Sequence, residues 1–262
     1  MTYENILFSV EQGIARLTLN RPDKLNSFNA AMHAEVREAL GRVTAEGGRV
    51  LILTGAGRGF CAGQDLGDRT VAPGGKGVDL GDSIENYYKP LVLALRNLPL
   101  PVIAAVNGVA AGAGANIALA CDLVIATRSS SFIQSFSKLG LVPDSGGTWF
   151  LPRLAGNARA LGLALLGEKL SAEQAEQWGL IWRCVDDAQF KDTVEALAAQ
   201  LAVAPTRGLA LTKRAIYESW SRTLEGQLDQ ERDLQRELGQ SHDYREGVAA
   251  FTAKRTPAFT GK

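Results

Sequence analysis

Residues 102–126 read VIAAVNGVAAGAGANIALACDLVIA, and this stretch indicates the fold better than any other. Residues 102–106 form a short apolar run typical of a buried strand, and residues 123–126 form a second such run. Between them, a glycine-rich turn precedes a helical pattern over residues 113–120. Strand, helix and strand in this order predict two parallel strands joined by a crossover helix.

The segments before and after this stretch extend the alternation of strands and helices. A tight turn at residues 11–13 separates two runs of apolar and polar residues, which predicts a β-hairpin near the start of the chain. The further segments are strands at residues 6–10, 14–19, 50–53 and 180–185, and helices at residues 29–43 and 84–95. We therefore expect the α/β class, with a sheet covered by helices.

The last third of the chain is dominated by helical patterns. Residues 209–220, 224–238 and 244–254 carry apolar stripes that exceed what the main core is expected to cover. Such stripes favour packing against another subunit. We divide the chain into a core, residues 1–200, and a C-terminal helical oligomerisation region, residues 201–262.

Composition excludes several classes of protein. A chain of 262 residues that is 46% hydrophobic can bury a substantial core. Its 28 basic and 28 acidic side chains balance, which disfavours general nucleic-acid binding. Three cysteines form neither a disulfide framework nor a metal motif, and the first residues do not resemble a signal peptide, so a cytoplasmic protein is expected. Polar residues interrupt the apolar stretch at 109–126, which argues against a membrane span.

Two glycine-rich turns, at residues 54–66 and 107–116, each follow an apolar strand. Missing side chains let a ligand approach the main chain, and the helix that begins at Ala113 adds the positive end of a dipole. Together these features suit a developing oxyanion. The glycines do not have the spacing of a phosphate loop or a dinucleotide fingerprint. Tight turns with close packing are an equally good interpretation of the glycines alone.

Six short motifs occur in a fixed order and resemble the crotonase (enoyl-CoA hydratase/isomerase) superfamily. They are Asn20-Arg21-Pro22, Leu53-Thr54-Gly55, Phe60-Cys61-Ala62-Gly63-Gln64-Asp65-Leu66, Val106-Asn107-Gly108, Cys121-Asp122-Leu123 and Gly140-Leu141-Val142-Pro143-Asp144. The resemblance implies a ββα spiral with a C-terminal helical trimerisation region. Within the superfamily, residues 140–149 and 255–262 resemble the isomerases that act on ring-1,2-epoxyphenylacetyl-CoA in bacterial phenylacetate degradation.

The resemblance also implies which residues carry the chemistry. The oxyanion hole of the family maps onto the backbone N–H groups of Gln64 and Ala113. The two glutamates of the hydratases fall on Asn116 and Phe136, and a phenylalanine can neither accept nor donate a proton, so hydration is disfavoured. The acidic residue of the isomerases falls on Asp144.

One carboxylate suffices for isomerisation, because the acid formed when Asp144 takes a proton can return that proton two carbons along. The expected reaction is a 1,3-proton shift through a thioester enolate, giving the oxepin-CoA product from the ring epoxide. The alternative interpretation of Asp144 is a helix N-cap before residues 148–154.

The resemblance assigns further residues to substrate binding. They are Lys24, Ala62, Gly63, Asp65, Leu66, Gly112, Phe136 and Trp149. Among these, Asp65 matches a turn aspartate with a structural role, and core packing explains Phe136 and Trp149 as readily as an aromatic acyl pocket. Residues 67–81 read as a loop that could close over substrate. No metal or nicotinamide is expected, since CoA is the handle of the substrate.

Other polar residues are weaker candidates. His33 and His242 are expected in surface or capping roles, and Cys61 as a small apolar filler. Asp82 and Glu85 are expected on a solvated helix face.

The expected partners are an acyl-CoA thioester and further copies of the chain, as trimers or hexamers, with a hydratase of the same pathway as a further candidate. Neither nucleic acid nor a membrane is expected. Three other functions stay open: a 3,2-enoyl-CoA isomerase of fatty-acid oxidation, an enoyl-CoA hydratase, and a non-catalytic acyl-CoA-binding subunit.

Overall fold

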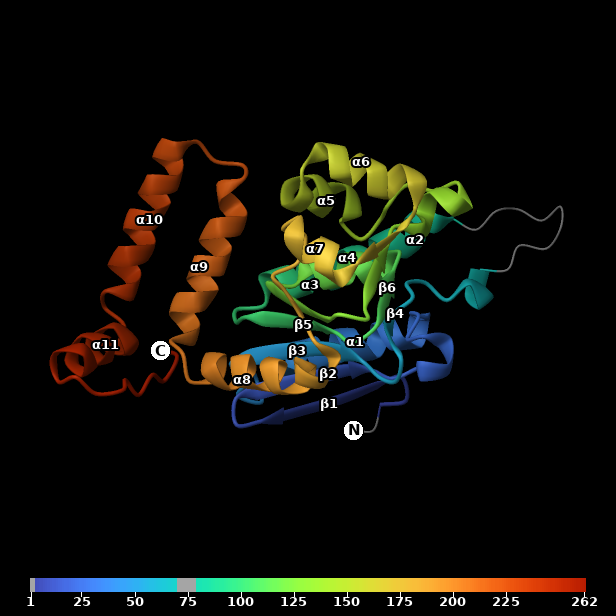
Figure 1. Cartoon of the computed structure of the whole chain (residues 1–262). Helices are drawn as coiled ribbons and strands as arrows, with labels where there is room; N and C mark the ends of the chain where they lie inside the picture. The colour runs from blue at the N-terminus through green and yellow to red at the C-terminus, as the bar shows by residue number, and fades with distance from the viewer. Residues whose placement is uncertain (1–2, 70–78) are drawn as a thin grey trace.

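The computed structural model describes residues 3–69 and 79–262 and contains two β-sheets. The larger sheet lies in the lower part of Figure 1, below α4 and α7. Its six strands lie in the order β1–β2–β3–β5–β7–β10. Their bounds are β1 Ile6–Glu11, β2 Ile14–Leu19, β3 Val50–Gly55, β5 Val102–Val106, β7 Leu123–Thr127 and β10 Arg183–Val185. Strands β1 and β2 form the predicted hairpin, and the pairs from β2 onward are parallel, which confirms the α/β class.

The predicted strand, helix and strand at residues 102–126 are confirmed. Strands β5 and β7 pair in parallel, with Ile103 opposite Leu123, and helix α4 (Ala113–Ala120) lies between them in the chain. All eight residues of α4 are buried. Because most of them are Ala or Gly, neighbouring backbone can approach the helix closely.

A second sheet, which the sequence did not predict, holds the turns that carry the site. Its strands lie in the order β4–β6–β8–β9. They are β4 Gly59–Cys61, β6 Val109–Ala111, β8 Ser131–Ile133 and β9 Lys169–Ser171. Two of them, β4 and β6, come from the glycine-rich turns and pair in parallel. The second sheet therefore brings these two turns side by side.

Helices cover both faces of the larger sheet. On one face α8 (Phe190–Ala202) packs on side chains of β2, β3, β5 and β7. Figure 1 shows α8 lying across these strands. On the other face lie α1 (Ala30–Arg42), α3 (Lys89–Asn97) and α4. The remaining core helices are α5 Gly147–Ala155, α6 Asn157–Leu166 and α7 Ala172–Gln177. These layers give the chain a single large apolar core with a smaller cluster under α8.

Two predicted elements differ in detail from the structure. The helix expected at residues 84–95 is a composite, with α2 (Leu80–Ser83), a π-helical turn (Ile84–Tyr88) and α3 in succession. The strand expected at residues 180–185 covers only Arg183–Val185. The loop expected at residues 67–81 falls largely on residues 70–78, outside the described residues, so the structure does not test closure over a substrate.

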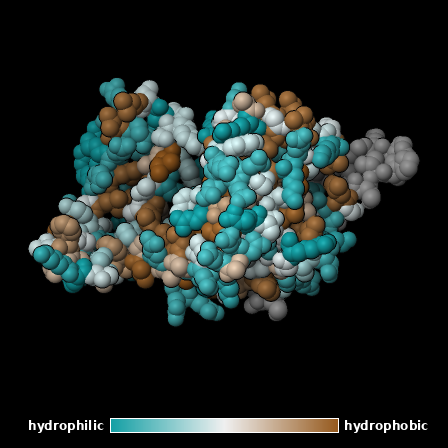
Figure 2. Space-filling view, viewed as in Figure 1, coloured by the Kyte–Doolittle hydropathy of each residue, from teal (hydrophilic) through white to brown (hydrophobic). Residues whose placement is uncertain are grey.

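The C-terminal helices stand apart from the two sheets, at the left of Figure 1. They are α9 (Thr206–Ser219), α10 (Leu224–Leu238) and α11 (His242–Thr252), close to the three predicted helices. Hydrophobic residues remain on their surface in Figure 2. None of the described helices is long and apolar enough to cross a membrane.

Candidate active site

The turn after β4 places the backbone of Gln64 in a defined orientation. The N–H of Phe28 donates to the carbonyl of Gly63 at 2.7 Å, and the N–H of Asp65 donates to the carbonyl of Phe28 at 2.9 Å. Backbone groups of successive residues in an extended segment point to opposite sides. The N–H of Gln64 therefore points away from Phe28.

Gly63 lies against the first residue of α4. A Cβ atom on Gly63 would be 2.9 Å from the carbonyl oxygen of Ala111 and 3.2 Å from the amide nitrogen of Ala113. The amide of Ala113 belongs to the first turn of α4, where N–H groups lack partners within the helix, and it has no acceptor among the residues described. The amide of Ala113 therefore lies beside Gly63, the residue before Gln64, whose amide is the other donor predicted for the oxyanion hole.

Close approach of the two turns depends on a second glycine. A Cβ on Gly114 would lie 2.2 Å from the carbonyl oxygen of Cys61, so no larger residue fits there. Burial raises the pKa of the Cys61 thiol to about 12. A thiol that stays protonated is a poor nucleophile, which agrees with the prediction that Cys61 fills space.

Phe136 lies at the start of α4. Its side chain is buried, and a Cβ on Gly112 would lie 3.8 Å from the Cζ atom of Phe136. The N–H of Gly112 donates to the carbonyl of Ile133 at 2.8 Å, which ties the turn to β8. An apolar ring therefore occupies the region where the family's hydratases are expected to carry a second carboxylate.

Asp144 lies in the turn before α5 and is half-buried. Its Oδ1 atom accepts a hydrogen bond from the hydroxyl of Ser145 at 2.9 Å. Gly146, and not Asp144, is the residue that caps α5, and no side chain caps that helix. The alternative interpretation of Asp144 as a helix N-cap is therefore wrong, because α5 begins at Gly147 and its N-cap position falls on Gly146, two residues after Asp144.

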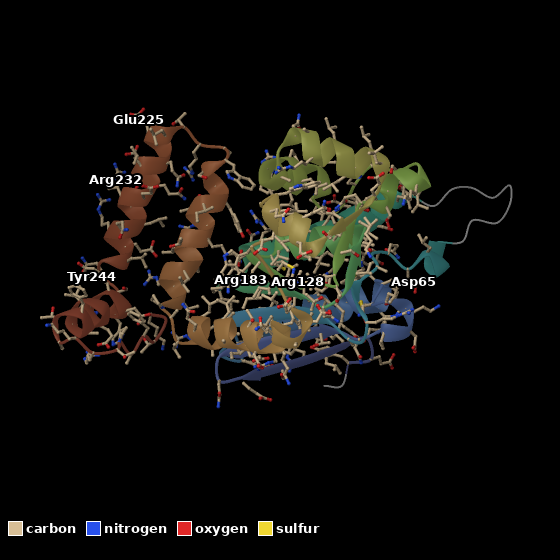
Figure 3. All side chains as sticks on the ribbon, viewed as in Figure 1. Asp65, Arg128, Arg183, Glu225, Arg232 and Tyr244 are labelled. Carbon is tan, nitrogen blue, oxygen red and sulfur yellow. The ribbon has the colours of Figure 1, made fainter. Side chains whose placement is uncertain are left out.

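Asp65 is fixed by its neighbours at the end of the same turn as Gln64. The guanidinium of Arg21 donates to its Oδ2 atom at 2.9 Å, and the N–H of Gly67 donates to its Oδ1 atom at 3.0 Å. The hydrogen bond from Arg21 holds the pKa of Asp65 below its usual value. Figure 3 shows Asp65 at the far side of the molecule from Tyr244 of α11. These contacts are those of a residue that stabilises the turn.

The remaining predicted binding residues have different surroundings. Lys24 and Leu66 are exposed near this turn, and the N–H of Ala62 donates to the carbonyl of Leu25 at 2.9 Å. Trp149 packs against Trp220, the residue that follows α9, with ring centroids 4.6 Å apart. The ring of Trp149 thus connects α5 to the end of α9, and it is 36% exposed, so it lies outside the core in which the alternative interpretation placed it.

Two aromatic residues near the turn of Gln64 are not among the site residues predicted from the sequence. The hydroxyl of Tyr88, in the π-helical turn, donates to Oε1 of Gln64 at 2.9 Å. His33 is buried, not exposed as predicted, and its ring lies 4.6 Å from those of Phe28 and Tyr88. The helical pattern of residues 29–43 could have placed His33 on the apolar face, one position after the buried Met32. No local signal marks Tyr88, because the π-helical turn sets its direction.

Charged and nucleophilic residues elsewhere add little to this site. Asp82 and Glu85 are exposed, as predicted. In the described part of the chain, no group of three or more His, Cys, Asp or Glu side chains is placed to hold a metal ion.

Comparison with known proteins agrees with this arrangement of turns and sheets. The model of the enoyl-CoA hydratase/isomerase family matches residues 9–262. The 1,2-epoxyphenylacetyl-CoA isomerase of Escherichia coli (strain K12) is 62% identical over 260 residues, covering 99% of each chain. A probable enoyl-CoA hydratase of Rhodobacter capsulatus is 50% identical over 262 residues and the full length of both chains.

A solved structure supports the same conclusion for the fold. The crystal structure of a putative enoyl-CoA hydratase from Streptomyces coelicolor superposes with a TM-score of 0.91 at 34% identity, covering 100% of this chain and 96% of that one. The predicted crotonase-like spiral with C-terminal helices is thereby confirmed. The chain belongs to the enoyl-CoA hydratase/isomerase family, the crotonases.

Proposed function

We propose that this enzyme isomerises an acyl-CoA thioester by moving one proton between two carbons. The amides of Gln64 and Ala113 hold the thioester oxygen, and Asp144 carries the proton. The observation that supports this most strongly is the position of α4. Its first residue borders Gly63, while Asn116, one turn later on the same helix, contacts the backbone of Asp144 at 2.8 Å. One helix therefore joins the proposed oxyanion hole to the proposed base.

The reaction needs two proton transfers and no electron acceptor. The carboxylate of Asp144 takes a proton from the carbon next to the thioester, and the negative charge moves onto the carbonyl oxygen. The two amides stabilise that charge, because they are fixed donors that need no reorganisation. The protonated Asp144 then returns the proton two carbons along, and the double bond shifts. This chemistry requires neither a metal nor a nicotinamide.

The proposed substrate is ring-1,2-epoxyphenylacetyl-CoA, and the product is the oxepin-CoA. Support comes from the 62% identity to the E. coli isomerase of that name. An arene epoxide and its oxepin interconvert by rearrangement of ring electrons. The step that needs the protein is thus the proton shift from the side-chain CH₂ group to the ring carbon.

Asn116 and Phe136 disfavour hydration, although one relative is named a probable hydratase. Adding water across a double bond requires one group to activate the water and another to protonate carbon. Asn116 is a buried amide engaged in two hydrogen bonds, and Phe136 is apolar. Asp144 then remains as the carboxylate assigned to the reaction.

The variant Asp144→Asn tests this proposal. It removes the base but keeps the size of the side chain, so the protein is expected to fold and to lose isomerisation. Exchange of the α-protons in D₂O, followed by NMR, is expected to stop as well. Asp82→Asn is the matched control, because that carboxylate is exposed and its loss should leave both rates unchanged.

Two results would contradict the assignment. An active Asp144→Asn variant would place the base elsewhere, and water addition to crotonyl-CoA at the isomerisation rate would support a hydratase. A simple 3-enoyl-CoA serves as the second substrate. Turnover of that compound far above turnover of the ring epoxide would favour a 3,2-enoyl-CoA isomerase.

The C-terminal helices are proposed to pack against other copies of the chain in a homotrimer, which can pair into a hexamer. None of the 14 residues of α9 is buried in the single chain, although the helix has an apolar stripe. The side chain of Phe251 on α11 is 86% exposed. A groove of about 450 Å³ runs between α9, α10 and α11 and the end of the chain, and its apolar lining includes Leu238, Tyr244 and Phe259. Exposed apolar surface of this kind supports contact with other copies of the chain.

A further inference from the structure

The side chain of Asn116 contacts the turn that carries Asp144 and takes no part in the proton transfer described above. We infer that Asn116 is a positioning residue, which fixes the backbone of Asp144 and so sets the direction of its carboxylate. This inference rests on the proposed function of Asp144 as the base.

The contact is direct and fully buried. Asn116 has no exposed surface, and its Nδ2 atom donates to the carbonyl oxygen of Asp144 at 2.8 Å. The same carbonyl accepts a second hydrogen bond from the N–H of Gly147, also at 2.8 Å. Two donors at normal distances hold this peptide group between α4 and the first turn of α5.

Gln134 sets the orientation of the Asn116 amide. The Nε2 atom of Gln134, itself buried, donates to Oδ1 of Asn116 at 2.8 Å. Because Oδ1 faces this donor, the NH₂ group of Asn116 is directed to the carbonyl of Asp144. The three residues form a chain of hydrogen bonds from the segment after β8 to the proposed base.

Gly147 makes room for this chain. A Cβ atom at residue 147 would lie 2.4 Å from Nδ2 of Asn116, closer than any side chain can approach. The glycine therefore serves two purposes. It admits the amide, and its own N–H provides the second hydrogen bond to Asp144.

The turn needs such support because its backbone is unfavourable. Ser145 has a φ of +51° and Gly146 a φ of +85°, two successive residues in the left-handed region. A residue other than glycine pays a conformational cost there, and such conformations persist when the surroundings hold them. Ser145 also donates to the carboxylate of Asp144 at 2.9 Å, so the direction of the side chain depends on the backbone of this turn.

A carboxylate at residue 116 could not perform this role. An ionised side chain would place an acceptor oxygen against the carbonyl oxygen of Asp144, where a donor is required. This gives a structural reason for an amide at a position where the family's hydratases are expected to carry a glutamate. An asparagine at residue 116 therefore provides no second base and also holds Asp144, the proposed base, in position.

The helix also explains why the effect should appear in kcat. Ala113 and Asn116 are three residues apart on α4 and lie on neighbouring positions of one face. The amide that is proposed to bind the thioester oxygen and the amide that holds Asp144 therefore share one rigid element. Loss of the Asn116 contact should displace the base relative to a substrate that still binds.

Three variants of the full-length protein test the inference. Asn116→Asp removes the donor with little change in size, and Gln134→Met removes the group that orients it. Ser130→Ala is the control, because Ser130 is also buried and also donates to a backbone carbonyl, that of Val106, at 2.9 Å. Each variant is measured for thermal stability, for kcat and KM of isomerisation, and for α-proton exchange in D₂O.

Asn116→Asp is expected to lower kcat and the exchange rate about 10- to 100-fold, with KM within about threefold of the wild-type value. Gln134→Met should produce a smaller loss of the same kind, and Ser130→Ala should keep kcat. If both variants retain the kcat of the control, or if only KM changes, the positioning role is wrong. If Asn116→Asp does not fold, the kcat of Gln134→Met relative to that of Ser130→Ala tests the positioning role.

The failure of this inference differs from a failure of the proposed function. An inactive Asp144→Asn variant together with full kcat in the Asn116 and Gln134 variants would overturn the positioning role alone. An active Asp144→Asn variant would overturn the assignment of the base, and the positioning role with it.

Discussion

Substitution of Gly63 by alanine tests whether the space between the two glycine-rich turns is an oxyanion hole. The added Cβ atom would lie 3.2 Å from the amide nitrogen of Ala113 and 2.9 Å from the carbonyl oxygen of Ala111. It would therefore intrude beside one of the two proposed donors. Since Gln64 follows directly in the chain, any shift of residue 63 would also move the other donor.

Two effects of this substitution can be separated. Gly63 has a φ of +90°, and an alanine in such a conformation costs about 1–2 kcal/mol of stability. Displacement of one oxyanion donor costs about 2.7–4 kcal/mol in the transition state, or about 10²- to 10³-fold in kcat. Gly47 is the matched control, because its φ is +83° and a Cβ there would meet nothing within 4 Å.

The assay compares Gly63→Ala and Gly47→Ala for thermal unfolding and for isomerisation kinetics. Both variants should lose stability because of the positive φ, Gly63→Ala the more because its Cβ also meets the backbone of Ala111, and only Gly63→Ala should lose kcat. The α-proton exchange rate in D₂O should fall with kcat, because the enolate is no longer stabilised. If Gly63→Ala keeps the kcat of Gly47→Ala, the amides beside Gly63 do not stabilise the reacting oxygen, and the proposed site is wrong.

Two further predictions concern stability and assembly. Asp65→Asn should lower the free energy of unfolding by about 1–2 kcal/mol at pH 7, because it removes the charged hydrogen bond with Arg21. Arg21 lowers the pKa of Asp65, so this contribution to stability is present at a pH above the ordinary pKa of 3.8 and is lost as the pH falls below it. If denaturant titrations give the same difference in unfolding free energy between wild type and variant down to pH 3, this reasoning is wrong. Phe251→Ser should shift the chain toward smaller species in sedimentation velocity. Leu7→Ser is the control, because Leu7 is also exposed but lies on the edge strand β1, and it should not change the mass. Equal masses for both variants would exclude α11 from the interface.

The longer elements could be predicted because their patterns are local. The hairpin of β1 and β2 follows from alternation around a short turn, and α1 begins after Asn29, whose side chain accepts from the N–H of Met32 as an N-cap should. The second sheet could not be predicted in this way. Its strands have three residues each, too few to show a period, and they form because the larger fold brings them together.

Errors at single residues have the same origin. A surface or capping role is predicted for His33 from its place on the first helix, but its ring packs against the aromatic rings of Phe28 and Tyr88 in the structure. The sequence offers an N-cap as the alternative role of Asp144, because aspartate often precedes the first turn of a helix. The N-cap position falls instead on Gly146, two residues after Asp144, and no local pattern indicates the left-handed conformation of Ser145 and Gly146.

The α/β class and the two glycine-rich turns could be predicted from the sequence alone, because each depends on neighbouring residues, and the proposal of Asp144 as the base came from an ordered set of motifs. Only the tertiary structure decided that the turns meet at Gly63 and Ala113, and that Asn116 holds the backbone of Asp144. Those contacts join residues 28 or more positions apart in the chain, and they depend on the direction in which α4 leaves the sheet. Periodicity reports which side of an element is buried, whereas the close approach of two backbones is fixed by the packing of all the elements around them.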